Sequence, residues 1–117
     1  LLAQATVCTL PSRYEPFGTV MPESWLAGVP LVATRAAGAT QYVTDGVDGL
    51  LCDIDDVGGL AEALHRAITD ERLRARLIAH GRETGERLFS RDAVVAQLIQ
   101  SYRGMIADFH EKGRRAA

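Results

Sequence analysis

The chain has 117 residues, of which 47% are hydrophobic and 24% charged, and its formal net charge is −2 at pH 7. This composition is typical of a globular protein with one domain or part of one. The small negative charge gives no general attraction to nucleic acid or to an anionic membrane, and no apolar run approaches the roughly 20 residues that span a bilayer. We therefore expect neither a nucleic-acid-binding protein nor a membrane-spanning one.

The first ten residues predict the end of one element and the whole of the next. The chain starts with Leu1 rather than methionine, and residues 1–4 look like the tail of a helix, so we expect a piece of a longer protein. Residues 5–10 are a short apolar and β-branched run that stops at Pro11. Such a run predicts a buried strand.

A loop and a helix should follow this strand. Residues 11–18 contain two prolines and a glycine, which predicts a loop, and Gly28 is a typical residue to end a helix. Pro22 helps to place the helix start, because proline is tolerated in the first turn and disfavoured later. We therefore expect the helix to begin near Gly18 or Thr19.

Two more strands are predicted before the chain becomes helical. Residues 30–34 are apolar and predict a buried strand, and residues 36–38 form a loop of small residues. Residues 39–44 could form one helical turn. The two Asp-Gly pairs within 45–49 predict tight turns before a third strand at 50–53.

The rest of the chain predicts three helices. Asp56 is the expected N-cap of the first, Thr69 or Asp70 of the second, and Ser90 of the third. Apolar residues at helical spacing should form one apolar face on each helix. These residues are Leu60, Leu64, Ala67 and Ile68, then Leu73, Leu77 and Ile78, then Val94, Leu98, Tyr102, Met105 and Phe109.

Strands that alternate with helices and are apolar throughout predict an α/β fold with a parallel sheet covered on both faces. Three strands leave an open sheet edge, which fits part of a larger doubly wound, Rossmann-like domain. We expect residues 1–55 to hold the strands, the loop and short helices, and residues 56–117 to be mainly helical. In such sheets ligands bind beyond the carboxyl ends of the strands.

The chemistry of the chain centres on the loop at 11–18 and on Glu23, which follows it. Glu15 and Glu23 can accept hydrogen bonds from sugar hydroxyls. The helix start between them can hold phosphate groups on its free N–H groups, without a metal. This combination suits a sugar joined to a nucleotide by a diphosphate.

Other residues have structural interpretations. Arg13 could hold the loop by pairing with a carboxylate, and Tyr14 could pack below the loop. Trp25 and Leu26 are expected to face the core. Asp45, Gly46 and Gly49 are most simply turn residues.

The two cysteines and the histidines indicate no metal chemistry. Cys8 and Cys52 lie in apolar surroundings and are expected to be buried, reduced thiols rather than a disulfide. The three histidines are His65, His80 and His110. They do not cluster at the spacing of metal ligands, so no metal site is expected.

Three segments together resemble a known enzyme family. The segment Pro-Ser-Arg-Tyr-Glu-Pro-Phe-Gly at 11–18 is followed by Glu23 and then by Leu-Ala-Gly-Val-Pro-Leu-Val-Ala-Thr at 26–34. The segment 45–51, Asp-Gly-Val-Asp-Gly-Leu-Leu, continues the likeness. Together they resemble the retaining glycosyltransferases of family 4, glycosyl transferases group 1, which have the GT-B fold. The chain resembles part of their C-terminal, nucleotide-sugar-binding domain.

The resemblance implies roles for matched positions only. Glu15 would contact the hydroxyls of the donor sugar and position the sugar during transfer, as the catalytic residue but not as a nucleophile. Backbone N–H groups at Phe17, Gly18 and Thr19 would face the diphosphate or the sugar. Glu23 would accept hydrogen bonds from the ribose hydroxyls. The donor would be a UDP-, GDP- or ADP-sugar, with no metal or other cofactor.

The sequence also departs from the family pattern. Gln41 stands where the family often has glutamate, and Ala36-Ala37 where a glycine often precedes Gly38. The family's basic residues that neutralise the diphosphate, and its acceptor domain, would lie before Leu1. We therefore expect this piece alone to have no transferase activity.

The resemblance implies an enzyme that transfers a sugar from a nucleotide diphosphate sugar to a hydroxyl acceptor, with retention. Polysaccharide, lipopolysaccharide or glycolipid synthesis would be its role. It would act in the cytoplasm or at the inner face of the membrane, with any membrane contact made by a preceding domain. Two alternatives stay open: a non-catalytic Rossmann-like module that binds a nucleotide or a protein partner, and a phosphorylase or epimerase of the same fold.

Overall fold

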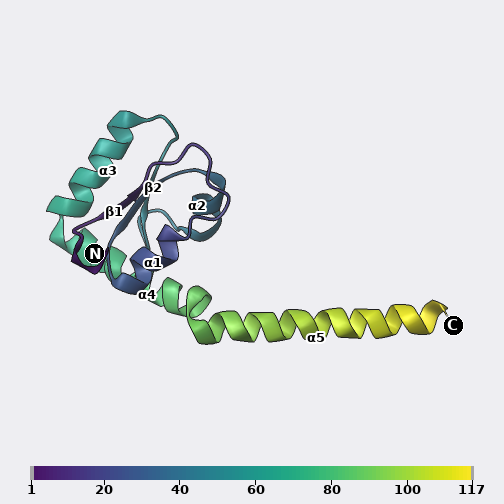
Figure 1. Ribbon diagram of the computed structural model, residues 1–117. Helices are drawn as coiled ribbons and strands as arrows, with labels where there is room; N and C mark the ends of the chain where they lie inside the picture. Colours follow the sequence, from purple (N-terminus) through teal and green to yellow (C-terminus); the bar gives the residue numbers. More distant parts are fainter. Residues whose placement is uncertain (1, 117) are drawn as a thin grey trace.

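A computed structural model describes residues 2–116 of the protein, with side chains up to residue 114. It consists of an α/β body and one long helix that projects from it (Figure 1). The elements in chain order are η1 (Leu2–Gln4), β1 (Cys8–Leu10), α1 (Val20–Ala27), β2 (Leu31–Thr34), α2 (Ala37–Tyr42), β3 (Leu50–Cys52), α3 (Val57–Thr69), α4 (Glu71–Phe89) and α5 (Arg91–Ala116).

The three strands form one parallel sheet in the order β1-β2-β3. The register pairs Cys8 with Leu31 and Val32 with Leu50. Every residue of the central strand β2 is buried, as expected for a strand that is covered on both faces. The predicted α/β class and parallel sheet are therefore confirmed.

Alternate residues of β2 belong to two hydrophobic clusters on opposite faces of the sheet. On one face, Leu31 packs with residues of α1, including Met21 and Trp25. On the other face, Val32 packs with residues of α3 and α4, including Ala67 and Leu77. Helix α4 contacts both α1 and α3 below the sheet (Figure 1), so it packs beside the helices of both clusters.

Trp25 is the largest fully buried side chain and ties three segments together. Its indole N–H donates a hydrogen bond of 2.7 Å to the backbone oxygen of Asp48. Two glycines of α4, Gly81 and Gly85, allow close approach, because a Cβ at either position would lie 2.5 Å and 3.1 Å from Trp25 atoms. The predicted core position of Trp25 is confirmed.

Asp48 has a larger role than the predicted turn. Its side chain is buried and accepts hydrogen bonds from the Thr44 backbone N–H (2.7 Å) and the Thr84 hydroxyl (3.0 Å). A buried carboxylate is costly unless it is hydrogen-bonded, and these two donors satisfy it. The turn is thereby fixed to helix α4.

The helix ends largely follow the sequence. Gly28 ends α1 in the left-handed conformation, with φ of 70°. Asp56 accepts a hydrogen bond from the Gly59 N–H (2.8 Å), and Asp70, rather than Thr69, accepts one from the Leu73 N–H (2.9 Å). The Ser90 hydroxyl accepts one from the Ala93 N–H (3.2 Å), so the three predicted caps are confirmed.

Some predicted details are wrong. Leu26 is 46% exposed, because it lies on a face of α1 that the described chain leaves partly uncovered. The first strand covers only Cys8–Leu10, since a turn hydrogen bond from the Ala5 N–H to Leu2 bends the chain just before it. The short helix begins at Ala37, two residues earlier than expected.

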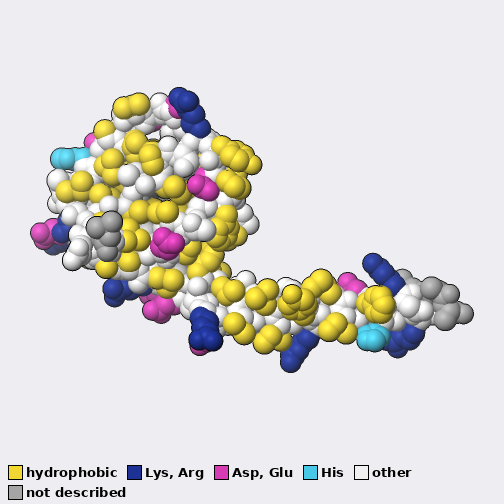
Figure 2. Space-filling model, in the orientation of Figure 1, with side chains coloured by type: hydrophobic (Ala, Val, Ile, Leu, Met, Phe, Trp, Pro, Cys, Tyr) yellow, Lys and Arg dark blue, Asp and Glu magenta, His cyan; other side chains and the backbone are white. Residues whose placement is uncertain are grey.

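Helix α5 differs from the rest of the structure. Its exposed apolar residues run along its length: Val94, Val95, Leu98, Ile99, Tyr102, Met105, Ile106 and Phe109. Figure 2 shows hydrophobic side chains over much of its visible surface. The predicted amphipathic helix is present, but no part of residues 2–114 buries its stripe. No helix within residues 2–116 is long and apolar enough to cross a bilayer.

Candidate functional site

The loop at 11–18 leaves the carboxyl end of β1 and leads into α1, which is where a parallel sheet of this kind binds ligands. Hydrogen bonds hold it at two points. The Thr34 hydroxyl, at the end of β2, donates to the backbone oxygen of Ser12. The Gly38 N–H, at the start of α2, donates to the backbone oxygen of Glu15 at 2.7 Å. The loop is therefore fixed to the end of β2 and to the start of α2.

Gly38 packs directly against the backbone of this loop. A Cβ at Gly38 would lie 2.7 Å from the Glu15 oxygen and 2.9 Å from backbone atoms of Phe17. Backbone atoms cannot move aside as the end of a flexible side chain can. Gly38 is therefore required for this approach, and its role could not be read from the turn pattern alone.

The backbone turns sharply at Gly18, whose φ is 74°. In the first turn of α1, the Met21 N–H donates to the Gly18 oxygen, the Glu23 N–H donates to the Thr19 oxygen, and Pro22 has no N–H. Within the described residues, no protein acceptor is found for the N–H groups of residues 17–20. The structure thus gathers several free donors at a helix N-terminus, which suits an anion.

The two predicted carboxylates lie on either side of these donors in the sequence. Glu15 is half-buried, and its Cγ lies 3.2 Å from the position that a Cβ on Gly18 would take. Glu23 is exposed on the first turn of α1. Within the described residues, neither carboxylate has a hydrogen-bond or ion-pair partner, so both can accept hydrogen bonds from a ligand.

An aromatic cluster supports the loop from the side of Phe17. The Phe17 ring makes edge-to-face contacts with Tyr42 (5.5 Å between centroids) and Phe89 (6.0 Å). Phe89 also lies 6.1 Å from Trp25. The cluster links the loop to α2 and α4, and no periodic pattern in the sequence predicts it.

Arg13 and Tyr14, the other side chains of the loop, behave differently. The Arg13 guanidinium donates to a carboxylate oxygen of Asp55 at 2.6 Å, which confirms that Arg13 pairs with a carboxylate. This hydrogen bond raises the pKa of Arg13 above its ordinary value. The expectation that Tyr14 packs below the loop is wrong, because Tyr14 is 81% exposed.

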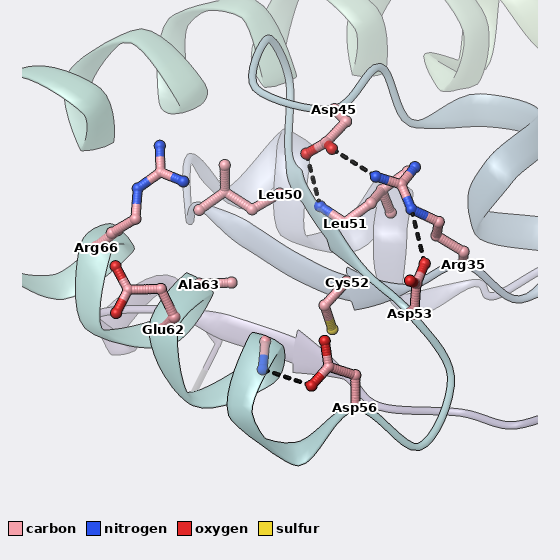
Figure 3. A pocket seen from close by; sticks show the side chains of 11 residues that line it. Arg35, Asp45, Leu50, Leu51, Cys52, Asp53, Asp56, Glu62, Ala63 and Arg66 are labelled. Carbon is pink, nitrogen blue, oxygen red and sulfur yellow. Dashed lines mark hydrogen bonds and ion pairs between the residues drawn. The ribbon is translucent and has the colours of Figure 1, made fainter.

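A cavity of about 270 Å³ lies at the outer edge of β3, away from this loop (Figure 3). Asp45 accepts hydrogen bonds there from the Leu51 N–H (2.9 Å) and from Arg35 (2.8 Å), and Arg35 also pairs with Asp53 at 3.3 Å. Asp45 therefore occupies a hydrogen-bonding position that another strand would need. The expected open sheet edge is therefore partly covered at β3, and β1 forms the other edge of the sheet.

A second cavity of about 150 Å³ lies at the carboxyl ends of the strands. Pro11, Ser12 and Arg13 line it from the loop, and residues 53–57 line it from the connection between β3 and α3. Val57 and Leu60 line it from α3, so the cavity is bordered by the loop, this connection and α3.

Cys8 and Cys52 are buried and free, as expected. Burial raises the pKa of each thiol. Such thiols are poor nucleophiles at neutral pH. Among the described residues, no group of three or more His, Cys, Asp or Glu side chains is placed to hold a metal ion.

The chain is similar to a known protein family and to known proteins. The family model for "Glycosyl transferases group 1" matches residues 1–84. The lipopolysaccharide core biosynthesis glycosyltransferase LpsE of Rhizobium meliloti is 40% identical over 99 residues, covering 85% of this chain and 29% of LpsE. The D-inositol 3-phosphate glycosyltransferase of a Nocardioides species is 38% identical over 109 residues, covering 93% of this chain and 24% of the relative.

Solved structures agree with this relationship. A sucrose-phosphate synthase from Thermosynechococcus elongatus superposes with a TM-score of 0.80 at 36% identity, over 89% of this chain and 26% of that structure. Anabaena HepE, solved in complex with UDP-glucose, superposes with a TM-score of 0.81 at 27% identity, over 88% of this chain and 29% of HepE. The chain thus spans about a quarter of the length of these proteins, and it belongs to the group 1 glycosyltransferases with the GT-B fold.

Proposed function

We propose that the chain is part of the nucleotide-sugar-binding half of a glycosyltransferase that transfers a sugar to an acceptor hydroxyl with retention. The observation that carries this proposal is the set of free N–H groups at 17–20, with an unpaired carboxylate before it and another after it. Free N–H groups at a helix start favour a diphosphate, and carboxylates favour hydroxyls. HepE, which superposes on this chain, was solved with UDP-glucose, and this supports a nucleotide-sugar donor.

In this proposal each group has one task. The N–H groups at Phe17, Gly18 and Thr19 bind the diphosphate and stabilise the charge that develops on it as the glycosidic bond breaks. Glu15 accepts hydrogen bonds from the sugar hydroxyls and positions the sugar. Glu23 accepts hydrogen bonds from the ribose. The N-terminus of α1 and basic groups from the rest of the protein supply the positive potential, without a metal.

We also propose a biosynthetic role for this sugar transfer. LpsE, whose name assigns it to lipopolysaccharide core biosynthesis, supports a role in assembling polysaccharide, lipopolysaccharide or glycolipid. We place the enzyme in the cytoplasm or at the inner face of the membrane. The donor is a UDP-, GDP- or ADP-sugar.

Calorimetric titration of UDP-, GDP- and ADP-sugars into the full-length protein, with and without EDTA, tests this proposal. We expect saturable binding of one class of donor that EDTA leaves unchanged. Binding that disappears in EDTA would contradict the metal-free site. Binding without sugar transfer to any hydroxyl acceptor would indicate a non-catalytic module.

Two substitutions separate the assigned roles. Glu23→Ala should weaken nucleotide binding by about 1.5–3 kcal/mol, the usual loss for a charged hydrogen bond. Glu86→Ala, at an exposed glutamate of α4, is the matched control and should bind normally. Glu15→Gln should lower turnover more than it lowers nucleotide affinity. Unchanged turnover at saturating donor would contradict the role of Glu15.

A further inference from the structure

One residue of the chain holds a backbone conformation that normally belongs to glycine. Asp55, in the connection between β3 and α3, has φ of 65°, and it is the only non-glycine residue with positive φ among residues 2–116. Side chains crowd the backbone in this region, although aspartate tolerates it better than most residues. Glycine would adopt it without strain. The carboxylate of Asp55 is therefore the feature that needs an explanation.

That carboxylate reaches across to the loop at 11–18, which is called the donor loop below. Its Oδ1 accepts a hydrogen bond of 2.6 Å from Arg13 Nε, a short charge-assisted contact between residues 42 positions apart. The backbone around Asp55 is itself fixed, because the Asp56 N–H donates to Asp53 and the Val57 N–H donates to Asp55. Arg13 thus pairs with a partner that a defined turn holds in place.

Apart from this pair, the described part of the chain holds the loop by hydrogen bonds to its backbone oxygens. Its hydrogen-bonded anchors to other elements are the backbone oxygens of Ser12 and Glu15. The cavity of about 150 Å³ lies between the loop and the 53–57 connection, and both Arg13 and Asp55 line it. Within the described residues, the ion pair is the hydrogen-bonded contact that joins the loop to this connection.

We propose that Arg13 and Asp55 are a positioning pair that fixes the donor loop, and through it Glu15, two residues along the chain from Arg13. Neither residue is placed in contact with the donor, and the inference rests on the proposed role of Glu15. Both side chains are largely exposed, at 81% and 62%, so the pair contributes little to global stability. Its effect is on the geometry of the loop.

Asp55→Gly is the decisive variant in the full-length protein, since it removes the carboxylate and also relieves the positive-φ strain. We expect its melting temperature to be unchanged or higher, while turnover at saturating donor falls about tenfold, less than the roughly 100-fold that an ångström of misplacement can cost. Arg13→Gln should lose the same factor, and the double variant should lose no more than either single one. Arg13→Lys should recover part of the turnover.

Arg35→Gln is the matched control, because Arg35 is also an exposed arginine in carboxylate pairs but lies at the edge of β3. It should leave turnover unchanged. If Asp55→Gly and Arg13→Gln turn over donor like the wild type, the positioning role is wrong while the proposed function stands. If their losses multiply in the double variant, the two residues act separately and the pair is wrong. A wild-type protein that binds no nucleotide sugar would overturn both proposals.

Discussion

Helices α4 and α5 have similar apolar periodicity and opposite surroundings. Leu73 and Leu77 of α4 are buried against the sheet and α3, whereas the corresponding apolar residues of α5 stay 40–76% exposed. The family match also ends at residue 84, within α4. The comparison teaches that apolar periodicity predicts a helix and its apolar face, but not whether a given piece of chain contains the surface that covers that face.

The largest expected effect is the difference in unfolding free energy between removing a buried aromatic side chain and removing an exposed one. Trp25→Ala should lower the free energy of unfolding of this chain by about 3–5 kcal/mol, because it empties the largest core position and removes the hydrogen bond to Asp48. Phe109→Ala on α5 is the matched control and should change it by less than about 0.5 kcal/mol. Urea unfolding of both variants measures the difference. Equal losses would mean that α5 is packed in solution.

The next effect tests the close packing of the donor loop. Gly38→Ala should cost about 1–3 kcal/mol of unfolding free energy, because the added Cβ meets backbone atoms of Glu15 and Phe17. Gly58→Ala adds a Cβ with only an ordinary contact to Asp56, so it is the control. In the full-length protein, Gly38→Ala should also weaken donor binding. Normal stability and binding would show that the loop can shift freely.

A smaller effect is expected in α5 itself. An added Cβ at Gly104 meets no atom within 4 Å, so Gly104→Ala should stabilise the helix by about 0.8–1 kcal/mol through helix propensity alone. Hydrogen exchange should slow in α5 while α4 exchanges as before. Slower exchange throughout α4 and the sheet would indicate that α5 unfolds together with the body.

The smallest effect concerns the two thiols. Because burial raises the pKa of Cys8 and Cys52, the folded state holds their protons more tightly than the unfolded state. Their contribution to stability is therefore full below the ordinary thiol pKa and declines as the pH rises through and above it. Alkylation by iodoacetamide at pH 7 should be slow in the native chain and faster in urea. Equal rates would contradict the burial of both thiols.

Much of the fold could be predicted because its elements depend on local patterns. Strand runs, the glycine at position 28 and the caps Asp56 and Ser90 each follow from residue type and spacing. The exposure of Leu26 and Tyr14 was not predictable in this way, since it depends on which parts of the molecule lie opposite. The burial and hydrogen bonding of Asp48 also depend on α4, which begins 23 residues later in the sequence.

The candidate site was predictable to a similar extent. The sequence placed Glu15, Gly18 and Glu23 around a helix start, and the structure shows free N–H groups at that point. Their roles toward a donor remain predictions. The aromatic contacts of Phe17 and the strained Asp55 could not be predicted, because both depend on contacts between distant segments.

A crystal structure of the full-length protein with UDP, or with the donor that calorimetry identifies, tests the central claim most directly. The account predicts diphosphate oxygens at about 2.7–3.2 Å from backbone nitrogens within residues 17–20, with Glu23 on the ribose. A diphosphate bound instead in the cavity at the edge of β3, beside Arg35 and Arg66, would contradict it.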